Sequence, residues 1–193
     1  MKNTQIDYKN VFYPPGGILL WILIMVELIT FSAALIALAV YSRENPEAYH
    51  QSRLMLNSTF GATNTIFLLT SGFFMATTIH LLKQAKVDKA QLFLKLTMLG
   101  GLLFLTLKSI EYYQKIEHGL TLGYNTFFSF YWLLTGFHVI HVIVGLIILT
   151  FIYFNIKKKR EEIDILDAEA GAAFWHMCDL IWLLLFPTLY LIF

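Results

Sequence analysis

Long apolar stretches separated by short polar segments are the main pattern of this chain. Hydrophobic side chains dominate residues 18–41, 60–82, 92–113, 126–154 and 170–193. A transmembrane helix needs about 20 such residues, because it rises about 1.5 Å per residue through a hydrocarbon layer of roughly 30 Å. The pattern therefore predicts an all-α membrane protein in which five transmembrane helices form one domain over residues 1–193.

Composition narrows the class of protein further. Of the 193 residues, 58% are hydrophobic and 14% are charged, whereas soluble domains average about 45–50% and 25%. These values exclude a soluble globular enzyme. The formal net charge is only +1, so nucleic acid is not expected as a partner. The single cysteine, Cys178, cannot supply paired thiolates, and we predict no metal site in this chain.

The positions of Lys and Arg predict how the chain is oriented. With five spans, the N-terminal segment and the second and fourth connections lie on one side, and they carry ten of these residues. The other side carries three, namely Arg43, Arg53 and Lys115. Because basic residues concentrate on the cytoplasmic side, we expect a cytoplasmic N-terminus and an external C-terminus.

Ionisable side chains inside the predicted spans are the candidate functional positions. A charged group at the centre of a membrane helix costs about 2.5–3.5 kcal/mol on insertion scales, so such groups normally face the bundle and find partners. The candidates at inner to middle depth are Glu27, His80, His138, His141, His176 and Asp179. Lys108 and Glu111 form a second layer, which we expect near the outer surface.

Spacing along the helices suggests how these groups pair. Residues three apart share a helix face, and the pairs with this spacing are Lys108 with Glu111, His138 with His141, and His176 with Asp179. For the first pair we expect an ion pair near the membrane surface. For the mid-depth groups two interpretations stay open. Either they form a proton relay, since His and carboxylates exchange protons near neutral pH, or they hydrogen-bond to one another as a connected layer that fixes helix packing.

A haem site within the chain is a further possibility, because His is a common axial ligand. His138 and His141 lie on one helix face and cannot bind opposite sides of the same haem. His80 fits this role with His176 or with a partner from the fourth span, provided that the two lie at matching depth. A haem here thus depends on His80 and one of these partners lying at the same level.

Several strings in the chain resemble the cytochrome c oxidase subunit III family of the haem-copper oxidases. Residues 135–145 resemble the family's TGFHxxHVIxG helix, and residues 174–182 resemble its YWHFVDxxW helix. Residues 111–113 resemble its EYY motif, residues 71–80 its helix in which Ser-Gly is followed by a His further along, and Glu27 the acidic residue of its SEVxxF helix. The five matches occur in the family's order and cover residues 17–193.

The resemblance implies an accessory, non-catalytic subunit of a terminal oxidase in aerobic electron transport. Such a subunit packs against the catalytic subunit I and other subunits, stabilises the metal site during turnover and binds membrane phospholipids. Haem and copper are then expected in the partner subunits, with no cofactor in this chain, and the membrane is a bacterial-type inner membrane. His80, Trp175 and Trp182 become candidates for lipid contact or helix packing.

Some features depart from the larger family members. Those proteins have seven helices, and this chain resembles the five-helix form that lacks the first two. Many members carry a carboxylate four residues after the second-helix His, thought to aid proton collection, where this chain has Gln84 beside Lys83.

Residues 182–190 resemble short proteins associated with nitric oxide reductases, so that association is the alternative function. A small transporter or a haem cytochrome is a weaker one, since no inverted repeat is visible.

Overall fold

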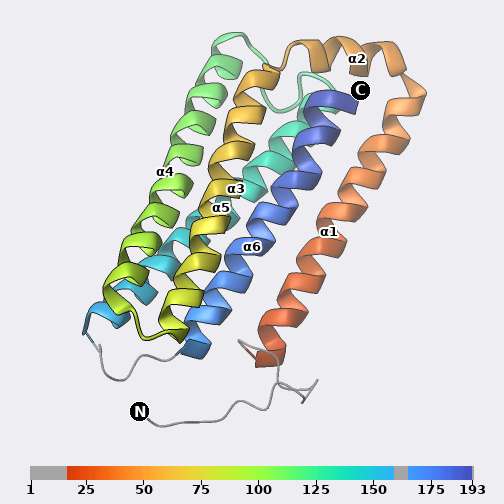
Figure 1. The fold of residues 1–193 in the computed structure, drawn as a ribbon. Helices are drawn as coiled ribbons and strands as arrows, with labels where there is room; N and C mark the ends of the chain where they lie inside the picture. The colour runs from red at the N-terminus through yellow and green to blue at the C-terminus, as the bar shows by residue number, and fades with distance from the viewer. Residues whose placement is uncertain (1–16, 159–164, 193) are drawn as a thin grey trace.

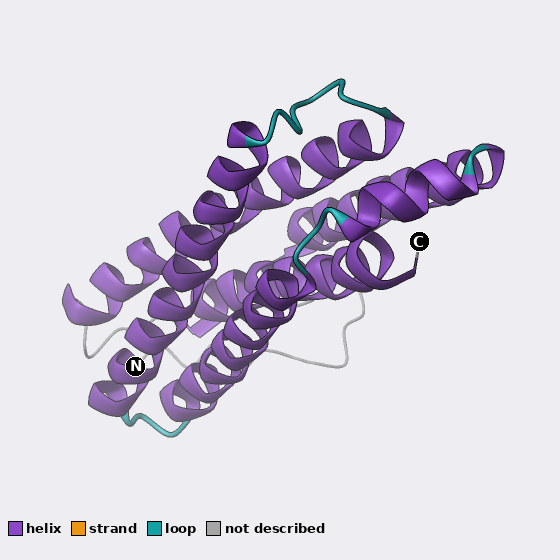
Figure 2. Ribbon diagram, turned by 90° about the horizontal axis from the view of Figure 1, so that it is seen from above, coloured by secondary structure: helices purple, strands orange, loops and turns teal. Residues whose placement is uncertain are grey.

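The computed structural model describes residues 17–158 and 165–192, which form a bundle of long helices (Figure 1). In chain order these are α1 (Gly17–Glu44), α2 (Pro46–Leu54), α3 (Ser58–Lys83), α4 (Val87–Glu117), α5 (Thr126–Lys158) and α6 (Ile165–Pro187), followed by a π-helical turn, η1 (Thr188–Ile192). Within the described ranges five helices are long and apolar enough to cross a membrane, and Figure 2 shows no β-strand. The predicted all-α class and the five predicted spans are confirmed, and the chain is a multi-pass membrane protein.

The helices extend beyond the apolar stretches that predicted them. α4 covers Val87–Glu117 against a predicted 92–113, and α5 continues to Lys158 against a predicted 154. An apolar stretch marks where a span lies in hydrocarbon, whereas a helix continues through polar residues until a cap or turn stops it. α3, for example, begins where Asn57 Oδ1 accepts a hydrogen bond from the Thr59 N–H at 3.0 Å.

The short helix α2 has no counterpart among the predicted spans, because its nine residues are mainly polar. It crosses the end of the bundle between α1 and α3 (Figure 1). The ring of its buried Tyr49 meets Phe127 of α5 edge-on, with ring centres 5.7 Å apart. Burial, with a smaller contribution from Glu44, raises the pKa of the Tyr49 phenol. α2 therefore anchors the connection between the first two spans.

α6 connects most of the bundle, since it packs against α1, α3 and α5. Its buried Trp175 donates a hydrogen bond from Nε1 to Ser71 Oγ of α3 at 3.0 Å. The same indole lies against Gly101 of α4 and Gly145 of α5, where an added Cβ would come within 2.6 and 2.8 Å of it. One side chain thus joins four helices, and the two glycines allow the close approach.

The last span ends in the π-helical turn η1. α6 ends at Pro187, which has no N–H to continue the α-helical hydrogen bonds. In the following turn the Tyr190 carbonyl oxygen accepts hydrogen bonds from Ser58 Oγ at 3.3 Å and from Arg53 at 3.4 Å. These bonds tie η1 to α2 and α3 and hold the Tyr190 ring inside the bundle.

Candidate functional site: polar groups inside the helix bundle

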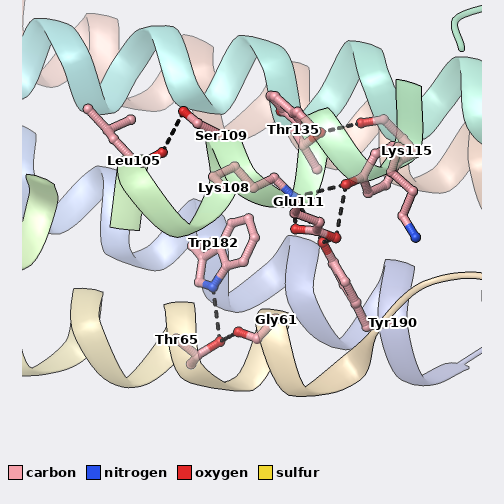
Figure 3. A network of polar contacts seen from close by, with 12 residues as sticks. Gly61, Thr65, Leu105, Lys108, Ser109, Glu111, Lys115, Thr135, Trp182 and Tyr190 are labelled. Carbon is pink, nitrogen blue, oxygen red and sulfur yellow. Dashed lines mark hydrogen bonds and ion pairs between the residues drawn. The ribbon is translucent and has the colours of Figure 1, made fainter. Parts of the chain in front are cut away.

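A buried polar cluster lies between α4, α5 and η1, and we call it the Lys108 cluster. It consists of Lys108, Glu111, Tyr131 and Tyr190 (Figure 3 shows the core of it). Lys108 Nζ lies 2.9 Å from Glu111 Oε2, and each side chain is 1% exposed. The ammonium also donates to the hydroxyls of Tyr190 at 2.8 Å and Tyr131 at 3.2 Å. Both hydroxyls donate in turn to Glu111 Oε1, at 2.7 and 3.0 Å. Two tyrosine bridges therefore reinforce one ion pair.

Aromatic rings surround the ammonium group of this cluster. The ring centres lying 4.8 to 5.5 Å from Lys108 Nζ belong to Tyr112, Tyr131, Trp182 and Tyr190. A cation within about 6 Å of a ring centre is attracted by the ring's quadrupole. Trp182 is held in place because its Nε1 donates to Thr65 Oγ1 at 2.9 Å (Figure 3). Hydrogen bonds and ring faces together offset the cost of removing two charges from water.

The expected ion pair between Lys108 and Glu111 is present, and protein encloses both side chains. Its expected depth, near the outer surface of the membrane, stays a prediction. α4 continues nine residues past Lys108 to Glu117, which corresponds to about 14 Å of helix. The sequence analysis missed Tyr131 and Tyr190, whose hydroxyls complete the cluster. The available signal was that each places a hydroxyl in an otherwise apolar part of a span.

Glu27 and His141 connect α1 to α5. Glu27 Oε1 lies 3.3 Å from His141 Nε2, while His141 Nδ1 lies 2.8 Å from the Phe137 carbonyl oxygen. A carbonyl oxygen only accepts hydrogen bonds, so Nδ1 must carry a proton. The contact between Glu27 and His141 therefore joins α1 to α5 through two polar side chains.

His176 and Asp179 form a second pair, on α6. His176 Nδ1 lies 3.4 Å from Asp179 Oδ2. The carboxyl group packs onto Gly72 of α3, where an added Cβ would overlap Asp179 Oδ2. The His176 ring, by contrast, is 45% exposed on the outside of the described bundle. This pair therefore has one buried member and one member at the surface.

His138 lies outside both pairs. Its side chain is fully buried, and neither ring nitrogen has a hydrogen-bond partner among the described residues. The ring stacks on Trp182 with centres 5.4 Å apart and meets Phe104 edge-on at 5.6 Å. The prediction of one connected polar layer was therefore wrong. The mid-depth groups separate into two pairs and a histidine held by aromatic contacts.

His80 and His176, the first pair considered for a haem, do not lie at one level. Gly72, which contacts the His176–Asp179 pair, precedes His80 by eight residues on α3, or about 12 Å. His80 instead lies 2.7 Å from Gln84. The geometry of His80 and His176 thus does not fit a shared haem. Over the described ranges, no group of three or more His, Cys, Asp or Glu side chains is arranged to hold a metal ion.

The two candidate tryptophans occupy interior positions. Trp175 and Trp182 are both buried within the described bundle. Each indole N–H donates to a hydroxyl of α3, Trp175 to Ser71 and Trp182 to Thr65. These contacts favour helix packing over lipid contact for both side chains.

Comparison with known proteins adds an independent result. The family model described as cytochrome c oxidase subunit III matches residues 56–192. The chain is 28% identical over 170 residues to a Corynebacterium diphtheriae protein named cytochrome c oxidase subunit 3, covering 84% of this chain and 81% of that protein. It is 29% identical over 173 residues to a Buchnera aphidicola protein named cytochrome bo(3) ubiquinol oxidase subunit 3, covering 89% and 84%. It is also 34% identical over 131 residues to cytochrome c oxidase subunit 3 of Rhipicephalus sanguineus, covering 66% and 49%.

The match spans most of the bundle. Residues 56–192 contain α3 to α6, the turn η1, the whole Lys108 cluster and the His176–Asp179 pair. Four of the five strings that suggested the resemblance therefore lie within the matched region, and Glu27 of α1 lies before it. The chain belongs to the cytochrome c oxidase subunit III family.

Proposed function

We propose that this chain is an accessory, non-catalytic subunit of a haem-copper terminal oxidase in aerobic electron transport. The proposal rests on the contacts that the buried polar groups make. In the Lys108 cluster and in the Glu27–His141 pair, they bond mainly to one another and join helices. Such pairing supports a rigid bundle rather than a site that opens to a substrate.

The subunit acts in this proposal by packing. It joins the catalytic subunit I and other subunits of the oxidase, which carry the haem and copper, and it contacts membrane phospholipids at its exposed apolar surface. We place it as one domain in a bacterial-type inner membrane, with the N-terminus cytoplasmic because ten of the Lys and Arg residues lie on that side. The names of the relatives, subunits of cytochrome c and ubiquinol oxidases, support this assignment.

Co-purification tests the proposal. The membrane is solubilised in a mild detergent, the chain is isolated by a tag, and the bound proteins are examined by mass spectrometry and by reduced-minus-oxidised spectra. We expect larger subunits that carry haem to elute with the chain, because its exposed apolar surface needs partners or lipid. The same tag on an unrelated multi-pass protein is the control. Recovery of the chain only as a homo-oligomer would contradict the proposal, and recovery with nitric oxide reductase subunits would favour that association instead.

A further inference from the structure

One face of α6 places a polar side chain among exposed leucines. We call this surface the His176 face, and it consists of His176, Leu180, Leu183 and Leu184. The spacings of four and three residues put these side chains on one side of the helix. The leucines are 39% to 46% exposed, and the His176 side chain is 45% exposed. The surface is therefore apolar except for the imidazole.

The imidazole lies within the apolar part of its span. That part covers residues 170–193, and His176 is six residues from its start, or about 9 Å along the helix. A hydrocarbon layer is roughly 30 Å thick, so this level lies inside the hydrocarbon and below the lipid headgroups. Lipid tails surround any side chain here that protein does not cover. Tails offer no hydrogen bonds, and a polar group left without them in an apolar medium costs several kcal/mol.

The contact between His176 and Asp179 leaves one nitrogen of the His176 ring for a partner outside the chain. His176 Nδ1 is engaged by Asp179 Oδ2, at 3.4 Å. The carboxyl group of Asp179 lies over Gly72 of α3, where the lack of a side chain leaves room for it beside the ring. With Nδ1 occupied, Nε2 is the nitrogen that remains to bond outside the chain. The His176–Asp179 pair thus presents one hydrogen-bonding group within the hydrocarbon layer.

We propose that the His176 face is the contact surface for a membrane-spanning helix of a neighbouring subunit, which brings a hydrogen-bonding side chain to His176. This inference rests on the proposed function, which supplies neighbouring subunits. A helix can place a polar side chain at this depth, whereas a phospholipid places its polar groups at the membrane surface. The leucines beside His176 give the apolar surface against which such a helix packs.

Site-specific photocrosslinking in the intact purified complex tests the inference. A photoreactive amino acid replaces Leu180, next to His176, or Leu102 as a control. Leu102 lies in the middle of α4 and is 54% exposed, close to the 46% of Leu180. We expect Leu180 to link to a peptide from a membrane-spanning segment of a co-purifying subunit, and Leu102 to link mainly to lipid. Lipid adducts alone at Leu180, as at Leu102, would overturn the inference.

Variants of His176 separate hydrogen bonding from packing. Interhelical hydrogen bonds in membranes contribute about 0.6 kcal/mol on average and at most about 1.7 kcal/mol, which corresponds to roughly a three- to twentyfold change in binding. We therefore expect His176→Leu to lower the peptide adduct at Leu180 by about this factor, and His176→Gln to retain most of it. An unchanged adduct in His176→Leu would contradict the role of the imidazole. An unchanged yield of each variant in the purified complex shows that it is folded.

The outcomes distinguish this inference from the proposed function. If haem-carrying subunits co-purify but Leu180 meets only lipid, the inference fails and the proposed function stands. If no haem-carrying subunit co-purifies, the proposed function fails. The His176 face is then supported only if Leu180 links to an identified membrane-spanning peptide whose polar residue faces His176.

Discussion

Replacing Lys108 with methionine is expected to destabilise the folded chain by about 3–5 kcal/mol, because this is the usual cost of removing one partner of a buried ion pair. The variant leaves Glu111, which is 1% exposed, without its counter-charge. The hydroxyls of Tyr131 and Tyr190 still donate to Glu111 Oε1, but they supply dipoles in place of a full charge. Unfolding in sodium dodecyl sulfate, followed by tryptophan fluorescence of the detergent-solubilised protein, measures the difference.

Two further variants show whether the lost charge is the cause. In the double variant Lys108→Met with Glu111→Gln both charges are absent, so we expect it to be more stable than Lys108→Met alone. Ser109→Ala is the matched control on the same helix, because the Ser109 hydroxyl bonds only to the Leu105 carbonyl on the exposed side, at 2.8 Å. If Lys108→Met is no less stable than Ser109→Ala, the cluster does not stabilise the fold.

Replacing Gly145 with alanine is expected to destabilise the chain by about 1–3 kcal/mol, the range for overpacking a well-filled interior. The new Cβ would lie 2.8 Å from a ring carbon of Trp175. The ring cannot retreat easily, because it is fully buried, is hydrogen-bonded to Ser71, and has Gly101 close against it. The same detergent unfolding experiment measures this loss.

Gly136→Ala is the control for this experiment. Gly136 lies on the same helix, and apart from the nearby helix backbone and its two chain neighbours no described heavy atom lies within 4 Å of the position its Cβ would take. Alanine there removes the helix penalty of glycine, so we expect equal or higher stability, by up to about 1 kcal/mol. A similar loss in both variants would show that the effect comes from the helix itself and not from the Trp175 contact.

The spans could be predicted from the sequence because each one depends on local composition. A stretch such as residues 126–154 is apolar enough to define a membrane helix by itself. The ends were less accurate, as with α4, because polar residues continue a helix beyond the hydrocarbon. α2 was missed for the same reason, since its polar sequence resembles a loop.

The Lys108 cluster could be predicted only in part. The pairing of Lys108 with Glu111 follows from a spacing of three residues on one helix. Tyr190, however, is 82 residues from Lys108 along the chain, and its place depends on how η1 folds back against α2 and α3. No local pattern carries that information. His138 was predicted to join a hydrogen-bonded layer, but its ring contacts Trp182 and Phe104 instead. These contacts depend on how the helices pack, which no local pattern predicts.

The lifetime of the oxidase during turnover tests the accessory role most directly. Oxygen consumption is followed from the first seconds until it decays, in complexes purified with and without this chain and matched for haem content. We predict the same haem spectrum and the same initial rate in both preparations, with faster decay in the complex that lacks the chain, because a packing subunit stabilises the assembly without taking part in the reaction. An immediate and large loss of the initial rate, in a complex whose haem spectrum is intact and whose activity does not decay faster, would contradict this account and place the chain's polar groups on an obligatory path for protons.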